Sequence, residues 1–302
     1  MYHAQGAFYV MKHTMDIRAA TQSEFETVTK WAADEGWNPG LNDLEAFYAA
    51  DPEGFLIGID DGDIVGSISV VKYGADYGFL GFYIVQPKYR GKGFGLQIWK
   101  AGMERLAGRT IGLDGVVEQQ DNYRKSGYKY AYDNIRYQGI VSKPKLSSLK
   151  SAHLGLEINT VTKDDFEQIS TLDKLCFGAE RASFLRSWLN NEQPNLRSSI
   201  MASSDGLITG FGTFRKCIDG YKIGPLFAED QPTAKQLLGA LIDAVPSSSL
   251  ITLDVPEPNA QAVMLAEELE LDPVFSTARM YCGNSINVKI EHIFGITTFE
   301  LG

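Results

Sequence analysis

Long hydrophobic runs, paired cysteines and histidines at metal-ligand spacing are all missing from this sequence of 302 residues. No apolar stretch approaches the roughly 20 residues that a membrane helix needs, so we expect no membrane partner. The cysteines, Cys176, Cys217 and Cys282, form no C-x-x-C pair, and the four histidines lack ligand spacing. We therefore expect reduced thiols, a cytoplasmic location and no metal site.

Positive charge is also scarce, because 28 Lys and Arg residues face 38 Asp and Glu residues, giving a net charge of −10. This balance argues against nucleic acid as a partner. It would suit a cationic amine substrate, but a solvated acidic surface is the better explanation. The first fourteen residues lack the basic start and clean apolar core of a secretory signal, and we expect an irregular extension over 1–14.

The chain repeats its own pattern at an offset near half its length. Three pairs of segments match in the same order: DIRAATQSEFETV (16–28) with EINTVTKDDFEQI (157–169), DDGDIVGSISV (60–70) with SDGLITGFGTF (204–214), and TIGLD (110–114) with LITLD (250–254). The repeat predicts two similar domains, at 15–142 and 154–302, joined by a Ser- and Lys-rich linker at 143–153.

Each half alternates short strands with helical spacing, which is typical of an α/β or α+β sheet flanked by helices. In the first half we expect strands at 16–20, 55–59, 64–72, 78–85 and 110–113, and helices at 22–35, after residue 95 and at 122–126.

A basic, glycine-rich loop lies between the strand at 78–85 and the following helix. It contains Arg90, Gly91, Lys92, Gly93 and Gly95. A helix N-terminus exposes unpaired N–H groups, and glycines let an anion approach them closely. The loop therefore predicts a pyrophosphate cradle, with a tight turn carrying solvated basic residues as the alternative. The P-loop pattern and G-x-G-x-x-G are both absent.

Arg90-x-x-Gly93-x-Gly95 resembles the Q/R-x-x-G-x-G/A loop of the GNAT (Gcn5-related N-acetyltransferase) superfamily, which binds acetyl-CoA. Tyr123-x-x-x-Gly127-Tyr128 is similar to another segment of that family, and the resemblance covers roughly 16–139. It implies a mixed, mostly antiparallel sheet flanked by helices and acetyl-CoA as cosubstrate. It also implies backbone bonds to the pantetheine and pyrophosphate from these residues: Tyr83, Ile84, Val85, Arg90, Gly91, Lys92, Gly93, Phe94 and Gly95.

The second half resembles the same fold but departs from it at the loop. Aligned on Gly206 and Gly210, Ala234 falls where Arg90 stands and Leu237 where Gly93 stands, while Glu229 and Asp230 add negative charge. The chain thus resembles tandem acetyltransferases with a C-terminal acetyltransferase-like domain, as do CFGAERASFLRSWL (176–189) and HIFGITTFELG (292–302). We expect the second half to bind no cofactor and to shape the acceptor site.

The resemblance implies that Tyr123 faces the cofactor sulfur, where a phenol can protonate the departing thiolate. A core position is the alternative for this tyrosine. The strand at 66–74 lacks the glutamate that many family members use as a general base. Asp114 and Glu118 are the candidates for that base near the active face, but a contact with the acceptor or a cap is the better interpretation of each. Trp37, in the expected acceptor loop, and Arg181, as a clamp for an acceptor carboxylate, complete the predicted contacts.

We therefore expect an N-acetyltransferase that acts on a primary amine of a small molecule or amino acid. One alternative is an acyl-CoA-binding sensor without turnover, favoured by the missing glutamate. Another is an enzyme that acetylates a protein lysine or N-terminus. The pattern leaves the acceptor, the acyl length and the oligomeric state open.

Overall fold

The computed structural model describes residues 15–150, 155–284 and 286–302. The extension expected at 1–14 therefore lies outside the described residues, as does the end of the expected linker. The first half contains these elements: β1 (Asp16–Ala19), α1 (Gln22–Asp34), α2 (Leu44–Ala50), β2 (Phe55–Asp60), β3 (Asp63–Tyr73), β4 (Tyr77–Val85), η1 (Pro87–Tyr89), α3 (Phe94–Arg105), β5 (Thr110–Val116), η2 (Val117–Gln119), α4 (Gln120–Lys125) and β6 (Lys129–Ile140).

The second half repeats much of this order. It contains α5 (Lys143–Lys150), β7 (Glu157–Thr160), η3 (Lys163–Asp165), α6 (Phe166–Phe177), α7 (Ala182–Trp188), β8 (Arg197–Ser204), β9 (Leu207–Lys216), β10 (Tyr221–Ala228), α8 (Gln231–Asp243), β11 (Leu250–Pro256), α9 (Ala260–Glu268), β12 (Asp272–Cys282), η4 (Ile290–His292) and β13 (Ile293–Gly295).

The sequence repeat has a local physical cause at α1 and at the matching segment of the second half, where η3 runs into α6. Thr21 and Glu24 form a capping box at the start of α1, in which each side chain accepts the backbone N–H of the other. Thr162 and Asp165 form the same box before α6. Capping satisfies N–H groups that a helix start leaves unpaired, so the same motif starts both helices.

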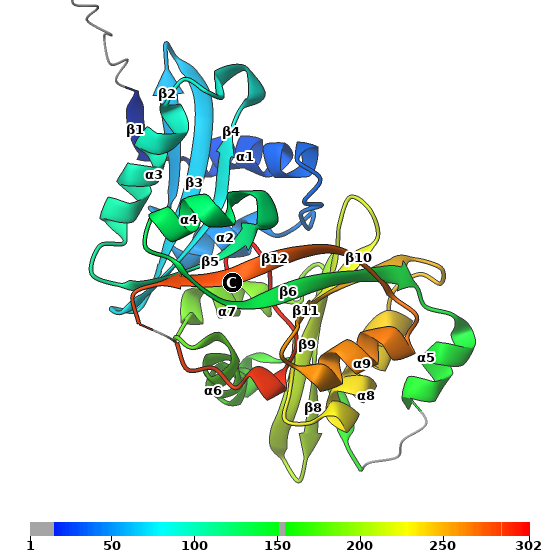
Figure 1. The fold of residues 1–302 in the computed structure, drawn as a ribbon. Coiled ribbons are helices and arrows are strands. Elements are labelled where there is room, and N and C mark those ends of the chain that lie inside the picture. The colour runs from blue at the N-terminus through cyan, green and yellow to red at the C-terminus, as the bar shows by residue number, and fades with distance from the viewer. Residues whose placement is uncertain (1–14, 151–154, 285) are drawn as a thin grey trace, which may run out of the picture.

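The strands of the described chain join in one mixed, mostly antiparallel sheet. Its order is β1-β2-β3-β4-β5-β12-β6-β11-β10-β9-β8-β7, and β13 pairs with β10. Figure 1 shows β6 and β12 side by side between the two lobes. The halves exchange a strand here, because β12 pairs with β5 and β6 pairs with β11. Each half of the sequence therefore completes the sheet of the other.

The segment expected as a linker is helical over most of its described length. Leu146 and Leu149 share one face of α5, and Leu149 is buried in the core that α8 and α9 form on the sheet. The i, i+3 spacing of these leucines is the cause, since it gives the segment an apolar face to bury.

Helices cover both faces of the first-half sheet. Phe25 and Val28 of α1 and Phe47 of α2 pack on one face, and Ile98 of α3 packs on the other. The predicted strands and helices of this half are all present, whereas α2 and β6 add to what the pattern predicted.

A bulge in β4 opens the sheet next to β5. Ser67 pairs with Ile84 and Ser69 pairs with Gly81, so Phe82 and Tyr83 together oppose one residue of β3. Phe82 is buried and has φ = 43°, and its carbonyl oxygen accepts a hydrogen bond of 2.8 Å from Ser67 Oγ. A bulge bends its strand and re-aims the residues beyond it.

Candidate active site

A pocket of about 840 Å³ lies where β4 separates from β5. The parallel pairing of these strands covers Tyr77–Leu80 and Thr110–Leu113, and the bulge turns the rest of β4 away. This divergence leaves a fork whose closed end is at Leu80. The pocket lining includes Tyr83, Ile84, Val85, Arg90 and Tyr123, together with Trp37, Asp114, Glu118, Arg136, Phe275, Phe299 and Glu300.

The backbone of Tyr83, Ile84 and Val85 forms one wall of the fork. Beyond Leu80 the edge of β4 that faced β5 is released from the ladder. Backbone N–H and C=O groups need hydrogen-bond partners, so an extended ligand lying in the fork can take the place of the missing strand. The structure thus brings these three predicted residues to one edge of the pocket.

Helix α3 begins at the open end of the fork, and its first N–H groups are uncapped. Gly93 is the N-cap, with φ = 86° and no side-chain cap, and Gly91 has φ = 76°. A Cβ at Gly95 would lie 2.7 Å from the hydroxyl oxygen of Tyr83, so a larger residue would require the Tyr83 side chain to shift. Phe94 buries its ring against Tyr89 and leaves its backbone N–H at the helix start. The helix start is therefore open to an anion.

The basic residues of the loop differ in their contacts. Arg90 lines the pocket, donates from Nε to the Val85 carbonyl oxygen at 2.8 Å, and pairs with Glu35. Lys92 is exposed and lies over the Tyr89 ring at 5.2 Å. An anion in the pocket would therefore compete with Glu35 for Arg90, while Lys92 can turn toward it without breaking an ion pair.

Tyr123 lies across the fork from β4. Its ring stacks on Trp99 with centroids 5.7 Å apart, and burial raises the pKa of its hydroxyl to about 12. A Cβ at Gly115 would lie 2.6 Å from the Tyr123 ring, so this glycine makes room for it. The phenol therefore stays protonated at neutral pH and borders the pocket, as a proton donor must.

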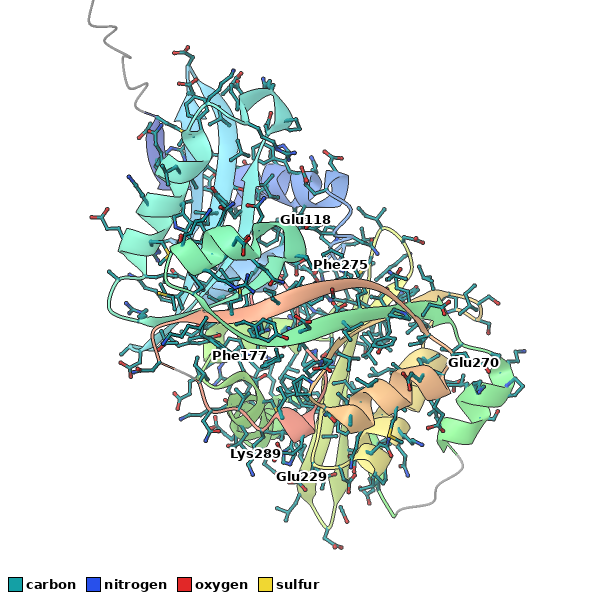
Figure 2. All side chains as sticks on the ribbon, viewed as in Figure 1. Glu118, Phe177, Glu229, Glu270, Phe275 and Lys289 are labelled. Atoms are coloured by element: carbon teal, nitrogen blue, oxygen red, sulfur yellow. The ribbon has the colours of Figure 1, made fainter. Side chains whose placement is uncertain are left out.

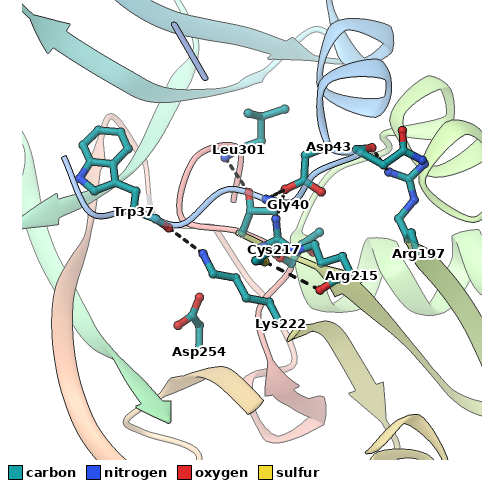
Figure 3. Close-up of polar contacts among 12 residues, drawn as sticks. Trp37, Gly40, Asp43, Arg197, Arg215, Cys217, Lys222, Asp254 and Leu301 are labelled. Atoms are coloured by element: carbon teal, nitrogen blue, oxygen red, sulfur yellow. Dashed lines mark hydrogen bonds and ion pairs between the residues drawn. The ribbon is translucent and has the colours of Figure 1, made fainter. Parts of the chain in front are cut away.

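Trp37 reaches the pocket on a loop that the second half holds in place. Lys222 Nζ donates to the Trp37 carbonyl oxygen at 2.8 Å (Figure 3). Asn38 exchanges two hydrogen bonds with Asp219. Asp43 pairs with Arg215 further along the same loop. The expected acceptor loop of the first half is thus built against β9 and β10.

Asp114 and Glu118 both line the pocket, but their surroundings differ. Asp114 is covered, forms two hydrogen bonds with Arg279 at 2.8 and 2.9 Å, and accepts another from Asn134. Desolvation raises the pKa of Asp114. Glu118 is exposed on η2. Figure 2 labels both Glu118 and Phe275, which belongs to β12. Glu118 is free to contact a ligand, whereas Asp114 chiefly joins β5 to the exchanged strand β12.

Arg181 lies outside the pocket lining, which corrects its expected role as an acceptor clamp. Its side chain is fully covered and makes two hydrogen bonds to Asp173, at 2.7 and 2.8 Å. Further bonds reach Thr297 and the Gly302 carbonyl oxygen. The guanidinium is engaged in holding 297–302 to α6, so its donors are not available to an acceptor carboxylate.

Replacing Arg181 by Ala should therefore lower the stability of the fold, because the substitution removes the partner of the Asp173 carboxylate. Asp173 would remain buried without its partner, which costs about 3–5 kcal/mol. Chemical denaturation measures this loss, and Arg124→Ala, at an exposed pair, should change stability by less than about 1 kcal/mol. A loss for Arg181→Ala no larger than that of the control would contradict the structural role.

The second half has the same fork, but its own chain fills it. Pairing of β10 with β11 covers Tyr221–Ile223 and Ile251–Leu253, and β13 then pairs with β10 at Leu226 and Phe227. The Ile296 N–H donates to the Asp254 carbonyl oxygen of β11 at 2.9 Å. The space that an extended ligand would need between β10 and β11 is therefore occupied by residues 293–296.

The helix that follows this second fork is closed to an anion as well. Asp230 caps α8 by accepting the Thr233 N–H at 2.8 Å. Strand β10 reaches α8 through residues 229–230 alone, whereas β4 reaches α3 through 86–93. The shorter loop corrects the alignment of Ala234 and Leu237 with Arg90 and Gly93, since both residues are buried inside α8. The Asp230 carboxylate therefore occupies the position at the start of α8 where a bound anion would lie.

Several pocket residues were missed by sequence reasoning. Arg136 on the exchanged strand β6, Phe275 on β12, and Phe299 and Glu300 near the end of the sequence all line the pocket. Arg136 makes two hydrogen bonds to Asp254 and lies 4.7 Å from the centroid of the Phe299 ring. The positions of Arg136 and Phe275 depend on the strand exchange, and those of Phe299 and Glu300 depend on where the chain runs after β13.

Comparisons with known proteins agree with this geometry. Residues 16–128 match the family described as Acetyltransferase (GNAT) family, and residues 169–295 match the one described as Acetyltransferase (GNAT) domain. A holothin acyltransferase of Pseudoalteromonas sp. (strain SANK 73390) is 32% identical over 289 residues, covering 96% of this chain and 95% of that protein. The chain belongs to the GNAT family of acyltransferases and carries two GNAT domains in tandem.

Solved structures share the fold over the whole chain. A putative acetyltransferase from Pyrococcus horikoshii has a TM-score of 0.79 at 22% identity and covers 100% of both chains. A tandem GNAT protein from the clavulanic acid biosynthesis pathway has a TM-score of 0.64 at 15% identity, covering 90% of this chain and 100% of that one. Within the described residues, no helix is long and apolar enough to cross a membrane.

Proposed function

We propose that the protein transfers an acetyl group from acetyl-CoA to a primary amine of a small molecule or amino acid. The observation that carries this proposal is the fork: its pocket is lined by the unpaired edge of β4, by Arg90 and by Trp37 of the acceptor loop, and the uncapped start of α3 follows Arg90 directly in the chain. The relative named holothin acyltransferase supports acyl transfer by a chain of this organisation.

The residues of the fork fit the cofactor by their chemistry. The N–H groups at the start of α3, with Arg90 and Lys92, would hold the pyrophosphate, and Gly91, Gly93 and Gly95 keep side chains out of its way. The released edge of Tyr83, Ile84 and Val85 would bind the amides of the pantetheine arm. The thioester would then lie toward Gly81, at the closed end of the fork, in the pocket that Tyr123 also lines.

Tyr123 is assigned as the general acid. When the bond between the acetyl carbon and sulfur breaks, the thiolate needs a proton, and the phenol is the donor that borders this part of the pocket. The stack with Trp99 fixes the orientation of the ring. A positioned donor of this kind contributes about 10²–10⁴-fold to the rate.

The two halves divide the work. We assign the cofactor to 15–142, with 154–302 shaping the acceptor site through β9, β10 and β12 and binding no cofactor of its own. The filled second fork and the capped α8 support this division. A cytoplasmic protein that acts with acetyl-CoA and without metal fits the reduced thiols expected from the sequence.

Replacing Lys222 by Met should weaken acceptor use and spare the cofactor. A hydrogen bond from a charged group is worth about 1.5–3 kcal/mol, so loosening the Trp37 loop should lower kcat/KM for the acceptor roughly tenfold. The Kd for acetyl-CoA should stay within about twofold. Steady-state kinetics and calorimetry measure both quantities. Lys216→Met, on the exposed end of β9, is the control, and equal acceptor kinetics in the two variants would argue against the loop's role.

A screen of amines with acetyl-CoA, read by release of free thiol, tests the function itself. We expect steady thiol release with small primary amines. Binding of acetyl-CoA without turnover of any amine or peptide would favour the sensor, for which the missing strand glutamate is the motivating observation. Turnover of peptides but not of free amines would instead indicate a protein lysine or N-terminal acetyltransferase.

A further inference from the structure

Glu300 is a covered carboxylate without a partner in the described part of the chain. The residue is 4% exposed, and neither an ion pair nor a hydrogen bond reaches its carboxylate from the described residues. The carboxylate oxygens are not sealed off from solvent. Because Glu300 lines the pocket, its carboxylate opens into the pocket. Burying an unpaired carboxylate is costly, and a ligand that donates hydrogen bonds would relieve that cost.

The cations around Glu300 are already engaged elsewhere. Arg136, Arg215 and Lys222 lie close enough to interact with its charge. Arg136 is bound to Asp254, Arg215 to Asp43, and Lys222 to the Trp37 carbonyl oxygen, as Figure 3 shows for Lys222. None of these three groups occupies the hydrogen-bonding sites of the Glu300 carboxylate.

The position of Glu300 is the closed end of the fork. Its carbonyl oxygen lies against Gly81, where a Cβ would clash with it, and Gly81 directly follows the last residue of β4 that pairs with β5. The pyrophosphate site at α3 lies at the opposite, open end. A thioester carried on an arm that runs along 81–85 therefore ends beside Glu300.

We propose that Glu300 binds the ammonium group of the acceptor and takes the proton that it must lose before attack. This inference rests on the proposed acetyl transfer and supplies the base that the strand at 66–74 lacks. The acceptor is then a primary amine that is positively charged in solution. The pocket beside the carboxylate has apolar walls formed by Phe275, Phe299 and Trp37. We infer that the acceptor carries a flat, apolar group next to its amine and that these side chains bind that group.

The proton balance of the reaction follows from these positions. The ammonium gives one proton to the Glu300 carboxylate, and the neutral nitrogen attacks the thioester carbonyl carbon. A carbon–nitrogen bond forms, the carbon–sulfur bond breaks, and Tyr123 protonates the departing thiolate. The second proton of the nitrogen restores Tyr123 through solvent, and Glu300 releases its proton to solvent. One proton leaves per turnover, which matches conversion of an ammonium and a thioester into an amide and a thiol.

The test compares wild type, Glu300→Gln and Glu291→Gln in the full-length chain. Glutamine keeps the size of Glu300 and one acceptor oxygen, replaces the other oxygen by an NH2 donor, and removes the charge and basicity. Glu291 is an exposed glutamate of η4 outside the pocket lining and serves as the matched control. The probes are the basic primary amine and the arylamine, neutral at pH 7, that the wild type acetylates fastest in the screen. Thermal melts and acetyl-CoA titration establish that each variant is folded and binds the cofactor.

We expect kcat/KM of Glu300→Gln for the basic amine to fall roughly 10²–10³-fold, within the range for a lost proton acceptor. Any activity on the arylamine should fall by much less, because that acceptor has no ammonium proton to lose. Three outcomes would overturn the assignment of Glu300 and leave the proposed acetyl transfer intact. They are a loss below about threefold for the basic amine, an equal loss for both probes, and a wild type that acetylates arylamines but no basic amine. Absence of turnover with every amine would overturn the proposed function instead, and this inference with it.

Discussion

A Gly93→Glu variant is expected to lose acetyl-CoA binding while remaining folded. Gly93 precedes α3 with φ = 86°, and an added Cβ would meet no atom within 4 Å, so the side chain points into open space at the helix start. The new carboxylate would stand at the uncapped N–H groups and repel the pyrophosphate. Two unit charges about 4 Å apart near a protein surface interact by roughly 4 kcal/mol, which corresponds to about a thousandfold in Kd before screening by salt.

The control for this variant is Gly62→Glu, in the turn between β2 and β3. Gly62 has φ = 85° and equally open surroundings, so the substitution carries the same backbone penalty of about 1–2 kcal/mol. Calorimetric titration should give unchanged acetyl-CoA affinity for the control. An affinity within threefold of wild type in Gly93→Glu would remove the assignment of the pyrophosphate to this loop.

Tyr123→Phe should lower kcat by roughly 10²–10⁴-fold and leave the Kd of acetyl-CoA nearly unchanged. The variant keeps the ring that stacks on Trp99 and removes the hydroxyl that borders the pocket. Because burial raises the pKa of Tyr123 to about 12, the phenol stays protonated through the ordinary assay range. The activity of the wild type should therefore show no loss that is due to Tyr123 between pH 7 and about pH 10.

Tyr130→Phe is the matched control, since Tyr130 is exposed on β6 and outside the pocket lining. Single-turnover kinetics separate the chemical step from product release. If Tyr123→Phe retains more than a third of the wild-type rate of that step, Tyr123 is a packing residue of the core that contains Trp99 and Met103.

Local features of the chain were predictable because they depend on neighbours in sequence. The turn at Gly62 and the glycines before α3 each act within a few residues, and both appear where the pattern places them. Tyr83, Ile84 and Val85 were expected at the site from the family resemblance, and all three line the pocket.

Long-range features were not predictable from one sequence. The exchange of β6 and β12 is decided by which strand edges meet, and alternation along a strand does not say which neighbour it takes. Arg181 illustrates the error that results, because its charge suggested a ligand contact while a distant Asp173 side chain and residues 297–302 bury it. Glu300 shows the opposite case, because it belongs to no recognisable motif and yet the fold places it in the pocket.

The central claim, that one fork binds the cofactor and the other is filled, is tested most directly by hydrogen exchange with and without acetyl-CoA. We predict slower exchange of the backbone amides of 81–85 and 91–96 on addition of acetyl-CoA, with unchanged exchange at 224–231 and 293–296. Calorimetry on the same sample should give one equivalent per chain. Protection of 224–231 or a second equivalent would contradict the account, as would acetyl-CoA binding that leaves exchange at 91–96 unaltered.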